Sequence, residues 1–85
     1  MNATILTPLQ ESNISTFLRT MPVDIQLNIE SCKEKWLTGD TAYGYPHPVQ
    51  VCDNALAANA RQPFLTDQQS VDLQILKNHL RIALQ

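Results

Sequence analysis

The most reactive side chains in this sequence belong to two cysteines and two histidines. His47 and Cys52 are five residues apart, across the start of an expected helix, so the imidazole and the thiol could form a base–nucleophile pair. Cys52 falls on the apolar side of that helix, however, where a thiol tends to be inert. The sequence has no G-x-S-x-G motif and no glycine-rich phosphate loop. We therefore predict that the protein is not an enzyme, and a His47/Cys52 enzyme is the weaker alternative.

The two cysteines, Cys32 and Cys52, both fall on apolar faces of expected helices. A disulfide or a redox switch is one interpretation of this pair. Free cysteines are commonly small core residues, and a reducing compartment favours that second interpretation. A metal site would need three or four ligands at suitable spacing, and neither C-x-x-C nor H-x-x-x-H occurs. We predict two core cysteines, no metal and no cofactor, and we place His79 at the polar edge of the last helix, near its end.

The stretch TAYGYPHPV at residues 41–49 suggests a binding site instead. Tyr43 and Tyr45 point the same way if the segment is extended, and the prolines beside them reduce the entropy lost when the segment is ordered. Tyrosine is also a preferred hot-spot residue at protein interfaces. The alternative is that these rings only close the gap between two helices. We predict contact with a partner protein through Tyr43, Tyr45, His47 and Trp36, although Trp36 also fits a core position.

Charge and hydropathy argue against several classes of protein. Only 16% of the residues are charged and the net charge is -2, with the basic residues scattered, which argues against a nucleic-acid groove. The last helix carries an amide-rich, weakly basic face, so a small DNA-binding regulator remains an alternative. No apolar run approaches the roughly 18 residues of a membrane span, and the N-terminus lacks the features of a secretion signal. We expect a cytoplasmic protein whose weakly charged surface also permits a homodimer.

The elements expected to position these side chains are helices in a single all-α domain, residues 1–85. Capping boxes beginning at Thr7 and Thr66 predict two helix starts. The predicted bundle has about four helices, at roughly 8–20, 22–37, 48–61 and 67–84, with a Tyr/Pro/Gly connection at 39–47.

The second helix is the ambiguous one. Apolar and polar residues alternate through residues 22–30, which is a strand pattern. Ile25, Ile29, Cys32 and Trp36 also form a helical stripe, and Gly39 lies where a helix C-cap would. The longer helical pattern favours one helix over a strand.

By elimination, the sequence predicts a small non-catalytic accessory factor, regulator or inhibitor that occludes or bridges another protein. An 85-residue chain buries roughly 60–65% of the surface that its unfolded form exposes, so stabilisation by a partner or by a second copy is consistent with its size.

Overall fold

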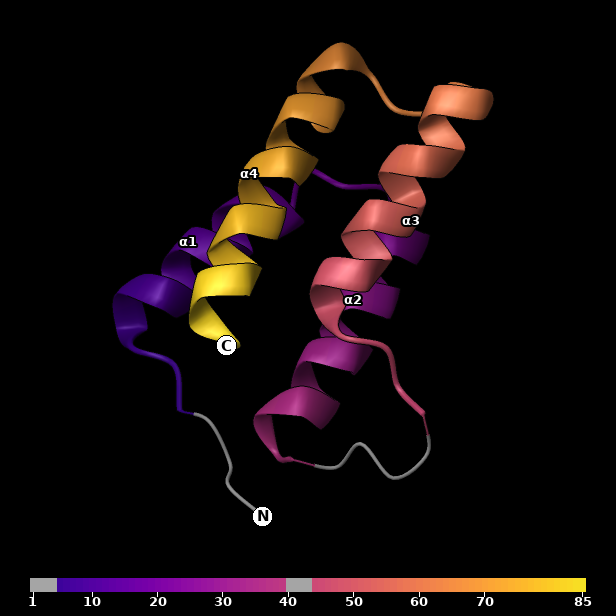
Figure 1. The fold of residues 1–85 in the computed structure, drawn as a ribbon. Coiled ribbons are helices and arrows are strands. Elements are labelled where there is room, and N and C mark those ends of the chain that lie inside the picture. The colour runs from indigo at the N-terminus through magenta and orange to yellow at the C-terminus, as the bar shows by residue number, and fades with distance from the viewer. Residues whose placement is uncertain (1–4, 40–43) are drawn as a thin grey trace.

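Four helices form the regular structure in the computed structural model, which describes residues 5–39 and 44–85. No strand occurs within these two ranges. The predicted all-α bundle is confirmed, and each helix end lies within two residues of its predicted position. The helices are α1 (Pro8–Leu18), α2 (Val23–Leu37), α3 (Pro48–Arg61) and α4 (Asp67–Ala83) (Figure 1).

Two helices begin with the capping boxes that the sequence predicts. At α1, the backbone N–H of Gln10 donates to Thr7 Oγ1 at 3.1 Å, and the N–H of Thr7 donates to Gln10 Oε1 at 2.9 Å. Thr66 and Gln69 repeat this exchange at α4, at 3.0 and 2.9 Å. Each pair satisfies two backbone donors that the first turn of a helix leaves free.

The ambiguous segment is helical from Val23 onward, as predicted. Its alternating pattern separates two faces of α2: Ile25 and Ile29 are buried, whereas Val23 and Leu27 are 69% and 58% exposed. Positions four apart lie on one side of a helix, so the apolar residues at 23 and 27 lie outside the core. The alternation therefore results from two exposed apolar residues and does not indicate a strand.

Helix α4 is the central element of the packing. It packs against α1 on one side and against α3 on the other, and α3 in turn packs against α2. In Figure 1, α1 and α2 lie behind α4 and α3. Leu73, Leu76 and Leu80 of α4 have no exposed surface, so the core is built around this helix. None of the helices in the described ranges is both long and apolar enough to cross a membrane.

Candidate functional site

The chain from Gly44 to His47 lies at one end of the bundle, between the end of α2 and the start of α3. The C-terminal end of α4 lies at the same end of the molecule, toward the bottom of Figure 1. Gly44 has φ +76°, a left-handed conformation that side-chain-bearing residues rarely adopt. A Cβ atom there would meet nothing within 4 Å, so backbone conformation, and not lack of space, favours glycine at this position.

His47 joins the start of α3 to the end of α4. Its Nδ1 accepts a hydrogen bond from the backbone N–H of Val49 at 3.1 Å, which caps α3. Its Nε2 lies 2.8 Å from the carbonyl oxygen of Leu84. A carbonyl can only accept, and Nδ1 must be unprotonated to accept from Val49. Both contacts are therefore satisfied by the neutral ring with its proton on Nε2, donating to Leu84.

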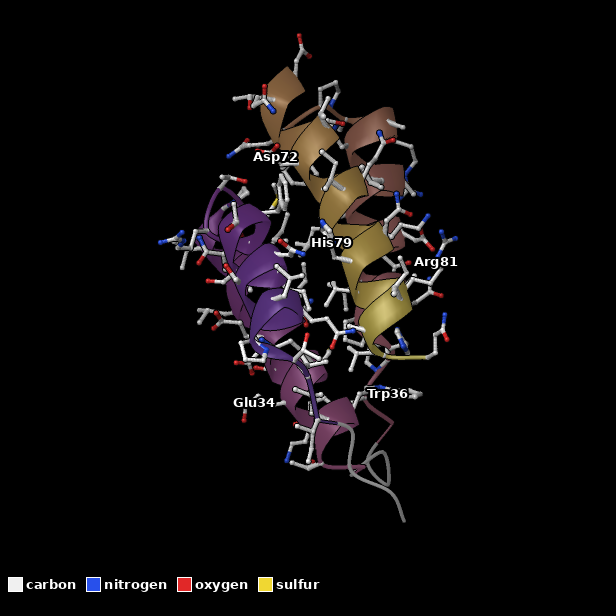
Figure 2. The ribbon with its side chains drawn as sticks, turned by 90° about the vertical axis from the view of Figure 1, so that its left-hand side faces the viewer. Glu34, Trp36, Asp72, His79 and Arg81 are labelled. Carbon is white, nitrogen blue, oxygen red and sulfur yellow. The ribbon has the colours of Figure 1, made fainter. Side chains whose placement is uncertain are left out.

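Trp36 connects the same segment to α2. Its indole N–H donates to the carbonyl oxygen of Tyr45 at 3.1 Å, and its ring meets the His47 ring in an edge arrangement, with centroids 4.8 Å apart and planes at 60°. The predicted core role for Trp36 is only partly met, because the side chain is half-buried and lies outside the buried core cluster. Figure 2 shows it near the end of the bundle where α4 terminates. Its indole is thus held in one orientation while part of it faces solvent.

Tyr45 packs back onto its own chain. Its ring is half-buried against the core, and Lys35 Nζ lies 5.4 Å from the ring centroid, within the range of a cation–π contact. The structure thus brings together three of the four residues predicted to contact a partner: Trp36, Tyr45 and His47. Tyr43, the fourth, lies outside the described residues.

An open groove of about 420 Å³ lies beside this cluster. This volume is within the range of small-molecule and side-chain binding pockets. Arg81 is the one formally charged side chain that lines it, and Figure 2 shows Arg81 on the side of α4 that faces away from α1. We call this site the Trp36 groove; it is lined by Trp36, His47, Val49, Gln50, Arg81, Leu84 and Gln85.

Sequence reasoning missed the contribution of α4 to this groove. Arg81 and Leu84 are more than 30 positions away from His47 in the chain, and no local pattern links them to it. The helical period of α4 predicts that Leu84 lies on the buried face of the helix. It does not predict that the backbone carbonyl of Leu84 contacts the imidazole of His47.

A second hollow, of about 580 Å³, is lined mainly by charged side chains of both signs. Glu34, which Figure 2 labels near the end of α2, is one of them. Acidic and basic groups alternate along this wall, so their fields largely cancel for an approaching ligand. The lining residues are Glu30, Ser31, Lys33, Glu34, Lys35 and Tyr45.

The base–nucleophile geometry considered for His47 and Cys52 does not form in this structure. Both ring nitrogens of His47 already face backbone groups, those of Val49 and Leu84. Burial, together with the negative charge of the neighbouring Asp53, raises the pKa of the Cys52 thiol to about 12. The thiol is therefore protonated and a poor nucleophile at neutral pH.

Both cysteines are free and buried in the core, as predicted. Burial also raises the pKa of Cys32. Within residues 5–39 and 44–85, no group of three or more histidine, cysteine, aspartate or glutamate side chains could hold a metal ion.

His79 is half-buried near the end of α4, and it also makes a packing contact that the predicted edge position does not include. Its ring stacks on that of Phe17, with centroids 5.6 Å apart and planes at 21°. Figure 2 shows the side chain between α4 and α1. This contact stabilises the α1–α4 pair and separates His79 from the Trp36 groove.

Comparison with protein-family models, with curated proteins and with solved structures finds no match for the chain.

Proposed function

We propose that this protein binds another protein through the Trp36 groove and the neighbouring Tyr45, and acts as a non-catalytic accessory factor, regulator or inhibitor by occluding or bridging that partner. The observation that carries the proposal is the fixed, half-exposed indole of Trp36, which is hydrogen-bonded to Tyr45 and meets the ring of His47 beside an open groove.

A fixed aromatic side chain suits binding for an energetic reason. An interface loses about 0.5–1.5 kcal/mol for each flexible side chain that it immobilises. Trp36 is already ordered by its own chain, so binding avoids most of this loss. Tryptophan, tyrosine and arginine are also the residues that most often dominate interface energetics, and all three occur here. Tyr43 belongs to the proposed contact set on the sequence grounds given above.

The groove also suits binding better than catalysis. Of its lining residues, His47 is the usual general base, and its two nitrogens are occupied by backbone groups. No aspartate, glutamate or cysteine side chain is among the residues that line the groove. We further propose that the protein acts in the cytoplasm, and its two free cysteines support a reducing compartment.

Self-association is the second candidate, and a different observation favours it. Leu9, Val71 and Ile82 are 70%, 50% and 61% exposed, and they lie on α1 and α4, which pack against each other. Large apolar side chains that are exposed on two helices packed together could be buried against a second copy. Sedimentation velocity across a concentration series would show a dimer that Ile82→Gln weakens; a monomer at every concentration would exclude this candidate.

Affinity capture from the lysate of the native host tests the main proposal. Wild type would be compared with Trp36→Ala, which removes the indole, and with Gln50→Trp, which fills the groove from an exposed position and leaves the contacts of Trp36 intact. Phe64→Ala is the matched control, because Phe64 is a half-exposed aromatic residue outside the Trp36 groove.

A partner retained by wild type and by Phe64→Ala but lost by both groove variants is the expected result. Circular dichroism would first establish that each variant folds. A partner retained by both groove variants, or the absence of any protein specific to wild type, contradicts the proposal.

A further inference from the structure

Arg81 gives the Trp36 groove a positive charge that its other lining side chains lack. Arg81 is its one formally charged lining residue, in a protein whose net charge is -2. The neutral ring of His47 adds no charge, because its hydrogen bonds to Val49 and Leu84 require the uncharged tautomer. Among its lining side chains, the groove therefore combines apolar groups with a single positive one.

Arg81 retains most of its hydrogen-bonding capacity for a ligand. Its guanidinium donates to Asn78 Oδ1 at 3.2 Å, at an exposed position on α4. The ion pair found between described residues is Lys77–Asp53, and it does not involve Arg81. A guanidinium has five N–H donors in a planar fork that matches a carboxylate, so one neutral partner leaves the fork available.

The backbone at this end does not reverse the sign set by Arg81. The start of α3 brings the positive end of its dipole to the groove, whereas the ends of α4 and of α2, which carries Trp36, bring negative ends. Each helix end is equivalent to roughly half an elementary charge, so their sum is smaller than the full charge of Arg81. The second hollow, with glutamates and lysines along one wall, has no comparable preference. Among the side chains that line the groove, Arg81 is thus the one that favours a negatively charged group.

From these observations we infer that the Trp36 groove takes a partner segment in which an aliphatic or aromatic side chain lies beside a carboxylate. The apolar side chain packs against Trp36 and Val49, and the carboxylate pairs with Arg81. This inference rests on the proposed function, because it assigns the chemistry of the partner at the same surface. It also adds specificity, since a lysine or arginine in place of the carboxylate would be repelled.

Selection from a random 12-residue peptide library displayed on phage tests this assignment. The immobilised wild-type protein is the bait, and clones that also bind Gln50→Trp are removed. Enriched peptides are expected to share an aspartate or glutamate next to an aromatic or aliphatic residue. For such a peptide, we expect Arg81→Gln to weaken binding about 2- to 5-fold, the range of an exposed ion pair, and Arg81→Glu to weaken it about tenfold or more through repulsion.

A charge swap provides the control for non-specific damage. Replacing the acidic residue of the peptide by lysine should weaken binding to wild type and restore it with Arg81→Glu, as a double-mutant cycle would show. Groove-dependent peptides that lack an acidic residue and ignore Arg81→Glu would overturn this inference and leave the proposed function standing. The absence of any peptide that Gln50→Trp displaces would overturn both.

Discussion

The two connections that flank α3 are held in different ways. After α3, Asn59 Oδ1 accepts from the backbone N–H groups of Phe64 and Leu65 at 2.8 and 2.9 Å, and the Thr66 capping box follows directly. All of these partners lie within a few residues of one another. Before α3, the ring of His47 reaches Leu84, which is 37 positions away in the chain.

This difference has a structural consequence. The connection after α3 takes most of its hydrogen bonds from its own side chains, although Leu65 packs against the core and Gln69 of the capping box also donates to the carbonyl of Thr20. The described part of the connection before α3, residues 44–47, depends on the docking of α2 and α4, because Trp36 and Leu84 supply hydrogen bonds to it. The proposed binding surface is therefore coupled to the packing of α4, the central helix of the bundle.

The largest expected effect comes from removing the distant contacts of His47. His47→Ala removes the helix cap, worth about 0.5–2 kcal/mol, the hydrogen bond to Leu84, worth about 1 kcal/mol, and the ring contact with Trp36. We expect the free energy of unfolding to fall by about 2–3 kcal/mol, measured by urea denaturation with circular dichroism.

The control for this substitution is His47→Asn, which can still cap α3 but cannot reach Leu84 in the same way. It should recover about half of the loss. If the alanine and asparagine variants were equally stable, capping would make no contribution and the account of His47 as a two-ended link would be wrong.

The same contrast explains what the sequence could predict. The capping boxes of Thr7 and Thr66 involve residues three positions apart, so their residue types alone define them. The buried stripe of α4 follows from helical periodicity in the same way. Such local signals predicted the number of helices and their ends.

The candidate site was only partly predictable. Composition identified Trp36, Tyr45 and His47 as residues of interest, but their mutual contacts and the part played by Arg81 depend on how α4 docks. His47 as a helix cap was also missed, because histidine is not among the preferred N-cap residues. The stack of His79 on Phe17 likewise joins two helices that are distant in the chain, and no local pattern encodes it.

A smaller expected effect is the pH dependence of stability that Cys52 causes. This residue lies in α3, between the two connections. Burial raises the pKa of this thiol to about 12 in the folded protein, from an ordinary value of 9.0. Below about pH 9 both the folded and the unfolded chain keep the proton. As pH rises from 9 toward 12 the unfolded chain releases it and the folded chain does not, so the stabilising contribution is lost.

Urea denaturation at pH 8 and pH 10 measures this loss. Wild type should lose about 1.4 kcal/mol more than Cys52→Ala over this interval, the value of one pKa unit. In the background of His47→Ala, whose substitution loosens the end of α3 nearest Cys52, the difference should shrink. A difference that is the same in both backgrounds would show that this end of α3 does not depend on His47.

The smallest expected effect concerns the locally organised connection. Asn59→Ala removes two hydrogen bonds, to Phe64 and Leu65, from a largely exposed turn. We expect a loss of about 1 kcal/mol, because water can replace part of what the amide oxygen supplies. Asn59→Asp keeps an acceptor in the same place and should be nearly neutral. The hydrogen bonds that Asn59 accepts come from Phe64 and Leu65 and are separate from the contacts of Trp36 with Tyr45 and His47. The fluorescence of Trp36, the one tryptophan in the chain, should therefore be unchanged in the folded Asn59 variants and altered in folded His47→Ala. A Trp36 signal that responds equally to both sites would mean that the two ends of α3 are coupled through the helix, and the contrast between a local and a distant mode of stabilisation would fail.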